Sequence, residues 1–132
     1  MKEISKYVTL ALFCDDFDVA KNFYVTYLNF KTETDKIIKI ENIGFRRVIL
    51  IHKFVDQLKI EFFINNEKSH KKNVEEKNST INLFNISCDN IDELFKKLSI
   101  IYPGLQIIET PFANFLTITD PMGNKIGLHQ NS

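Results

Sequence analysis

The side chains that could carry out catalysis are few and widely spaced in this chain. Histidine occurs as His52, His70 and His129, and the two cysteines are Cys14 and Cys88. These spacings lack the close pairs of a zinc site, and the chain has neither a phosphate-binding loop nor a nucleophile elbow. His52 and His70 fall at a strand end and in a polar stretch, where we expect exposure to solvent. No catalytic motif is therefore evident.

Polar and aromatic side chains that could line a pocket are more informative. Successive strand residues point to opposite faces of a sheet, so the expected strands divide into two sets. The set expected to pack against helices is Leu10, Leu12, Cys14, Ile60, Phe62, Phe84, Ile86, Cys88, Ile126 and Leu128. The opposite set is Tyr7, Thr9, Ala11, Phe13, Glu61, Phe63, Leu83, Asn85, Ser87, Gly127 and His129. The second face mixes aromatic with polar groups, as small-molecule pockets do.

Composition excludes several classes of partner. The chain has 132 residues, of which 44% are hydrophobic and 26% charged, as in a soluble globular domain. Seventeen basic residues balance seventeen acidic ones, so we expect no affinity for nucleic acid or anionic lipid. No apolar run approaches the ~20 residues of a membrane span, and residues 1–6 lack the apolar stretch of a signal peptide. We therefore expect a cytoplasmic protein with free, inert thiols.

The elements that position these side chains occur twice. A strand at 7–14 precedes an acidic helix start at 15–18, a helix to about Leu28, and strands near 30–40, 43–52 and 57–64. A strand at 80–88 precedes a capped helix with an apolar face, and strands follow near 105–110, 114–119 and 124–130. We expect a single domain of two modules, 1–66 and 79–132, joined by a solvated polar linker at 67–78.

Identities between the two halves support a duplication. The segment Cys14-Asp15-Asp16-Phe17-Asp18 matches Cys88-Asp89-Asn90-Ile91-Asp92 at an offset of 74 residues. Lys59-Ile60-Glu61 and Lys125-Ile126-Gly127 match in the last strand of each half. Matches at equivalent points of two strand-helix-strand-strand-strand units indicate repeated structural units.

These modules resemble the vicinal oxygen chelate superfamily, which includes glyoxalase I, extradiol dioxygenases, fosfomycin-resistance enzymes and bleomycin-resistance proteins. The stretch from Asp16 through Phe23-Tyr24 to Leu28-Asn29-Phe30 is similar to the first helix of that family, with Asn29 where Gly is usual. The stretch 120–126, Asp-Pro-Met-Gly-Asn-Lys-Ile, is similar to its turn into the final strand. The resemblance implies an α+β fold of two tandem βαβββ modules that form a curved mixed sheet around a cavity.

Metal-using members take one ligand from the first strand and one from the last strand of each module. Carried over by register, those positions are Thr9, Glu61, Leu83 and Gly127. A catalytic divalent ion needs three or four N or O donors, and Glu61 alone qualifies. Asn82 is a weak alternative if the register of its strand shifts by one residue. We therefore expect no metal and no cofactor, and the chain does not fit the enzymes of the family well.

The expected ligand-binding residues are Thr9, Phe13, Arg46, Glu61, Phe63, Asn85, Phe115 and His129. Arg46 either pairs with Glu61, grips an anionic ligand, or forms an outward salt bridge. Glu61 is either functional or a partly exposed strand carboxylate, and His129 fits the pocket rim better than a catalytic role. Phe13, Phe63, Phe112 and Phe115 either stack on a planar ligand or serve packing or a dimer seam.

The leading hypothesis is a metal-independent binding protein of the glyoxalase/bleomycin-resistance type that sequesters a drug or aromatic metabolite. The alternative is a metal-dependent lyase, dioxygenase or thiol transferase, which needs ligands such as Glu61, His129, Asn82 or His52. A third possibility is an interaction module with a collapsed pocket. The resemblance also implies a homodimer, in which modules are sometimes exchanged between chains.

Overall fold

The computed structural model describes residues 7–64 and 81–131. The chain divides into two compact units between residues 69 and 70. The expected polar linker at 67–78 lies outside the described residues, as does His70. Neither helix in the described part of the chain is long and apolar enough to span a membrane.

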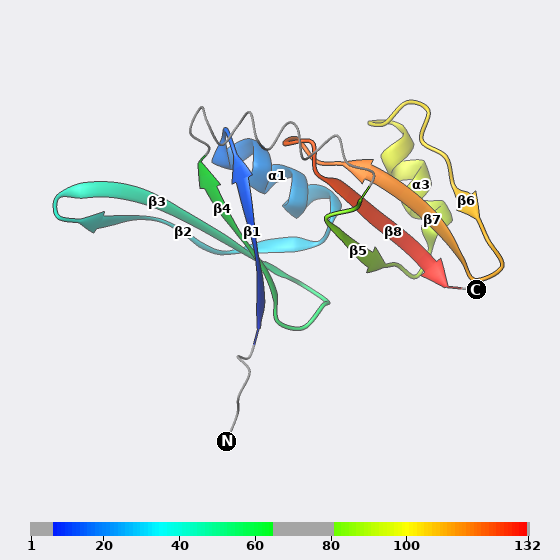
Figure 1. Ribbon diagram of the computed structural model, residues 1–132, viewed down its shortest axis with the longest axis horizontal. Helices are drawn as coiled ribbons and strands as arrows, with labels where there is room; N and C mark the ends of the chain where they lie inside the picture. The colour runs from blue at the N-terminus through cyan, green and yellow to red at the C-terminus, as the bar shows by residue number, and fades with distance from the viewer. Residues whose placement is uncertain (1–6, 65–80, 132) are drawn as a thin grey trace, which may run out of the picture. The chain divides into compact units, whose positions relative to one another are not determined.

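The first unit is a βαβββ module (Figure 1). Its elements are β1 (Val8–Cys14), α1 (Phe17–Tyr27), β2 (Phe30–Ile40), β3 (Ile43–His52) and β4 (Leu58–Ile64). They form a sheet of order β1-β4-β3-β2, in which β1 and β4 are parallel and the other pairs antiparallel. The Asp16 carboxylate caps α1 by accepting the backbone N–H groups of Asp18 and Val19. Asn29 follows the helix with a φ of 62°, in the left-handed conformation. Gly adopts this conformation most readily at helix ends, and Asn is the next most common residue there.

The second unit repeats this plan. Its elements are β5 (Phe84–Ser87), α3 (Ile91–Ser99), β6 (Ile108–Glu109), β7 (Ala113–Thr119) and β8 (Lys125–Asn131). The sheet order is β5-β8-β7-β6, with β5 parallel to β8. Asn90 caps α3, and the side chain of Gln130 accepts a second backbone N–H at that end, from Ile91. The α+β fold with tandem βαβββ modules is thus confirmed, with one four-stranded sheet in each module.

The burial of strand residues follows the predicted two faces at most positions, with Gly127 an exception because it is buried. The buried side chains on the helix-facing side include Leu12, Cys14, Ile60, Phe62, Ile126 and Leu128. On the opposite side, Thr9, Ala11, Phe13 and Phe63 are exposed, as are Asn85 and Ser87 of β5. Each sheet therefore packs one face against its own helix and leaves the other open to a ligand or partner.

The β2–β3 hairpin extends well beyond the rest of its sheet (Figure 1). β2 pairs with β3 along its whole length, but β3 pairs with β4 only from Val48 to Ile51. Within the described part of the chain, residues 36–47 therefore pair with each other and with no other strand, and they are called the arm below. The arm turns at Glu41 and Asn42, whose φ values of 51° and 68° fit the two-residue turn that follows the twist of a hairpin.

Candidate functional site

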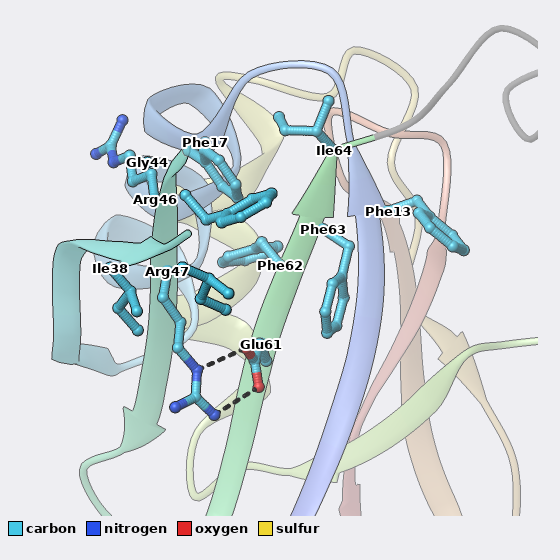
Figure 2. A pocket seen from close by; sticks show the side chains of 12 residues that line it. Phe13, Phe17, Ile38, Gly44, Arg46, Arg47, Glu61, Phe62, Phe63 and Ile64 are labelled. Carbon is cyan, nitrogen blue, oxygen red and sulfur yellow. Dashed lines mark hydrogen bonds and ion pairs between the residues drawn. The ribbon is translucent and has the colours of Figure 1, made fainter. Parts of the chain in front are cut away.

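A cavity of about 620 Å³ lies in module one where the arm leaves β4. Because β3 has no partner on this side beyond Val48, the last residues of β4 and the arm enclose a space between them. The lining residues are Phe13, Phe17, Ile38, Ile40, Gly44, Phe45, Arg46, Arg47, Glu61, Phe62, Phe63 and Ile64. Figure 2 shows that these residues come from β1, α1, the arm and β4. The volume and the apolar lining suit a small organic molecule.

The polar centre of this cavity is an ion pair between Arg47 and Glu61 (Figure 2). Arg47 donates from Nε to Glu61 Oε2 at 2.9 Å and from Nη2 to Oε1 at 3.3 Å. This fork raises the pKa of Arg47 above its usual value, first through the hydrogen bonds and then through the charge of Glu61. The Arg47 side chain is 49% exposed and that of Glu61 is 17% exposed. Both carboxylate oxygens are therefore engaged behind the guanidinium.

Arg46 turns the other way, toward α1. It donates to both oxygens of Asp35 at 2.9 Å and to both oxygens of Asp18 at 2.8 and 3.4 Å. Its guanidinium also lies 5.4 Å from the centre of the Phe17 ring. The hydrogen bonds from Arg46, with a further bond from Lys21, hold the pKa of Asp35 well below its usual range. Arg46 thus lines the cavity, but the partner of Glu61 is Arg47.

The remaining predicted residues of module one divide between the cavity and its surroundings. Phe13 and Phe63 line the cavity from adjacent positions of β1 and β4, with ring centres 6.4 Å apart. Thr9 lies on the same open face beside Lys59 and outside the lining set. Lys59 bonds Glu33 at 2.9 Å and covers the ring of Tyr7 at 4.2 Å.

In module two, the predicted residues share the open face of the sheet. His129 pairs with Ser87 on one side and with Phe115 on the other, and the His129 and Phe115 rings are 6.0 Å apart. Two residues earlier on each strand, Asn85 lies beside Gly127. A Cβ atom at Gly127 would stand 1.9 Å from Asn85 Oδ1, so the space beside Gly127 is filled by the Asn85 amide. That amide oxygen accepts from Asn82 Nδ2 at 3.0 Å.

The four positions that correspond to the ligands of the metal-using members do not form a donor set. Leu83 and Gly127 have no donor atoms, Thr9 has one neutral hydroxyl, and both oxygens of Glu61 are held by Arg47. Among the residues that the structure describes, no group of three or more His, Cys, Asp or Glu side chains is arranged to hold a metal ion. The residues present do not fit the divalent ion that the resemblance suggested for its metal-using members.

A histidine and the two cysteines were the other side chains whose chemistry could serve catalysis. The prediction that His52 is exposed is wrong, because it is only 8% exposed and its Nδ1 accepts the backbone N–H groups of Phe54 and Val55 at 3.0 and 2.8 Å. Cys14 is buried and Cys88 half-buried on the helix-facing side. Burial, followed by the charge of Asp89, raises the pKa of the Cys88 thiol, so the reactive thiolate is disfavoured.

Sequence reasoning missed Arg47 and the arm residues Ile38, Ile40, Gly44 and Phe45. Arg46 and Arg47 are successive residues of one strand, so their side chains point to opposite faces, but selecting the partner of Glu61 requires the pairing of Ile49 with Glu61. That register is a tertiary property. The signal that could have pointed to the arm is its apolar residues at every second position around a turn.

Comparison with known proteins gives one family. The model of the Glyoxalase/Bleomycin resistance protein/Dioxygenase superfamily matches residues 6–128. No curated protein matches the chain.

Solved structures of similar proteins extend over nearly the whole chain. TnmS3, an antibiotic binding protein from Streptomyces sp. CB03234, has a TM-score of 0.69 and 21% identity, covering 100% of both chains. UcmS2 has a TM-score of 0.69 and 19% identity, covering 98% of each chain. A superfamily member from Sphaerobacter thermophilus DSM 20745 has a TM-score of 0.63 and 18% identity, covering 96% of this chain and 98% of the other. At these identities the likeness shows the fold alone.

Proposed function

Since the chain belongs to the Glyoxalase/Bleomycin resistance protein/Dioxygenase superfamily, we propose that it binds a small, partly aromatic molecule without a metal ion. The family resemblance drawn from the helix and turn motifs is confirmed. The superfamily contains both enzymes and binding proteins, so the fold does not select between them. The residues of the site are therefore the basis for choosing between an enzyme and a binding protein.

The observation that carries the proposal is the cavity beside the arm. Its lining is dominated by phenylalanine and isoleucine side chains, and its one carboxylate, Glu61, is neutralised by Arg47. Such a site stabilises an apolar or aromatic molecule by burial and ring contacts, and it offers no open coordination position. TnmS3 is described as an antibiotic binding protein, which supports sequestration of a drug or aromatic metabolite as the role of this chain too.

Binding is assigned first to Phe13, Phe63 and the Arg47–Glu61 pair, which line the cavity. Asn85, Phe115 and His129 form the corresponding open face of module two, and Thr9 lies at the margin of the face in module one. We further propose a homodimer, as the family resemblance implies, in which a second copy covers open sheet surface.

Fluorescence anisotropy of a neutral aromatic probe, anthracene carboxamide, tests this function on the full chain in buffer containing EDTA. We expect saturable binding at one site, unchanged when Zn²⁺ or Mn²⁺ replaces EDTA. Phe63→Ala should weaken binding about tenfold through lost burial and ring contact. The control is Phe54→Ala, since Phe54 is 77% exposed and lies outside the cavity.

Binding that requires a divalent ion, or metal-dependent turnover, would contradict the proposal and favour the lyase, dioxygenase or transferase alternative. Absence of probe binding, with no other aromatic compound binding at the cavity, would favour the interaction module with a collapsed pocket.

A further inference from the structure

The cavity beside the arm offers a ligand more free hydrogen-bond donors than acceptors. A guanidinium has five N–H donors and no acceptor. Arg47 uses one N–H of Nε and one of Nη2 on Glu61, which leaves the rest of its donors available. The acceptors of Glu61 are consumed by the same two bonds. An incoming molecule therefore meets donors at the polar centre of the cavity.

The other polar side chain in the lining contributes much less. All three nitrogens of Arg46 already donate to Asp18 or Asp35. Apart from Arg46, Arg47 and Glu61, the lining side chains are Phe or Ile, together with one glycine. Among the described residues, Arg47 is thus the main side chain that can make new hydrogen bonds to a molecule in this cavity.

The exposure of the two side chains also favours Arg47 over Glu61 as the group that contacts a ligand. The Arg47 side chain is 49% exposed, whereas that of Glu61 is 17% exposed and lies behind it. A ligand cation would approach the guanidinium before the carboxylate and would be repelled. A ligand anion would approach the guanidinium directly and form charge-assisted hydrogen bonds with it. The planar guanidinium can also stack on an aromatic ring, as the flanking phenylalanines can.

We infer that this site, if it binds small molecules as proposed above, selects planar aromatic molecules that carry an anionic oxygen, and that Arg47 determines this preference. Glu61 is a positioning residue in this arrangement. Its two hydrogen bonds hold the Arg47 guanidinium in one position between β3 and β4, at the cavity that both residues line. The preference is thus a property of the pair, with the guanidinium as the group that touches the ligand.

Three probes that differ only in their polar group test this inference. They are anthracene bearing a carboxylate, a carboxamide or an aminomethyl group at one ring position, titrated near neutral pH with fluorescence anisotropy. We expect the carboxylate to bind about tenfold more tightly than the carboxamide, since a charge-assisted hydrogen bond contributes roughly that factor. The ammonium probe should bind most weakly. The carboxylate preference should shrink as salt is added, because the pair is partly exposed.

The informative variant removes both charges together, so that neither partner is left alone. Arg47→Gln combined with Glu61→Gln should abolish the carboxylate preference while the carboxamide still binds. The matched control is Lys59→Gln combined with Glu33→Gln, which removes another ion pair of the same module outside the cavity. That control should keep the preference. Circular dichroism of each variant checks that the fold is intact.

The outcomes separate this inference from the function on which it rests. If the carboxamide binds at the cavity but the carboxylate has no advantage, the binding function stands and the inference fails. A carboxylate preference that survives in the Arg47/Glu61 double variant would overturn the role of Arg47. Failure of all three probes to bind would count against the proposed function itself.

Discussion

Replacing His52 tests how the turn between β3 and β4 is held. His52 Nδ1 accepts the backbone N–H groups of Phe54 and Val55, and its ring meets Phe30 edge-on at 4.8 Å. In His52→Ala both N–H groups lose their acceptor and the ring contact disappears. Two hydrogen bonds and one aromatic pair together contribute about 2–4 kcal/mol to the free energy of unfolding. His52→Asn is the matched variant, because Asn Oδ1 can replace Nδ1 as acceptor, so we expect about half that loss.

The same geometry fixes the sign of the pH dependence. Burial lowers the pKa of His52 below 6.5, and a hydrogen bond with the backbone of Leu28 only partly opposes it. Protonated Nδ1 cannot accept the two N–H groups, so the folded chain takes up this proton less readily than the unfolded chain. The stability that neutral His52 provides is complete above pH 6.5 and is lost as the pH falls through the lowered pKa of the folded state.

Urea unfolding across a pH series, followed by circular dichroism, measures this effect, and NMR titration of the His52 ring gives its pKa directly. We expect the stability difference between wild type and His52→Ala to narrow as the pH falls below 6.5. The stability difference between His52→Asn and His52→Ala should stay constant over the same range, because neither variant has the titrating ring. The reasoning is refuted if that difference stays constant with pH, or if the His52 ring titrates at or above 6.5.

Two further substitutions test the packing around the open faces. Gly127→Ala would place a Cβ atom 1.9 Å from Asn85 Oδ1, so the Asn85 side-chain amide should swing aside and break its hydrogen bond with Asn82. We expect this variant to lose about 1 kcal/mol of stability in thermal unfolding and to shift the NMR signal of the Asn85 side-chain amide. In an Asn85→Ala background, which removes the amide that the new Cβ would meet, Gly127→Ala should cost less than it does in the wild type. Arg46→Gln should raise the pKa of the Asp35 carboxyl, as measured by NMR, because Arg46 is its principal hydrogen-bond partner. Asp35 stabilises the fold above its unfolded pKa and loses that effect as acid protonates it, so this variant should show a weaker acid dependence of stability.

The positions of the strands and the helix in module one could be predicted from the residue pattern within each segment. The stretches 30–40 and 43–52 are strands with the predicted limits, because both are rich in β-favouring residues and a turn separates them at Glu41 and Asn42. The stretch 105–110 was predicted as a strand, yet only Ile108–Glu109 pairs with β7. Thr110 Oγ1 bonds the backbone of Ala113 and so starts a tight turn there. An apolar pattern shows that a segment is extended, but not how many residues find a partner.

Side-chain identities within the site were harder to predict, for a reason that His52 and Arg47 share. His52 is a polar residue at a strand end, and it is buried because the following turn folds its N–H groups onto the ring. Arg47 meets Glu61 because Ile49 happens to be the register partner of that glutamate. Both facts depend on backbone geometry between segments, which periodicity within one segment does not contain.

The duplication also explains why the two modules carry different chemistry on one framework. In the parallel strand pair of each module, a small residue lies beside a polar one: Ala11 beside Glu61, and Asn85 beside Gly127. The polar side chain belongs to the last strand in module one and to the first strand in module two. In module two the partner must be glycine, since a Cβ at Gly127 would overlap Asn85. From the last strand, Glu61 accepts hydrogen bonds from Arg47 on β3, whereas Asn85 on the edge strand accepts a hydrogen bond from Asn82. The small and the polar residue thus exchange strands between the two modules. Module one consequently carries a charged pair at this register, and module two carries an uncharged amide.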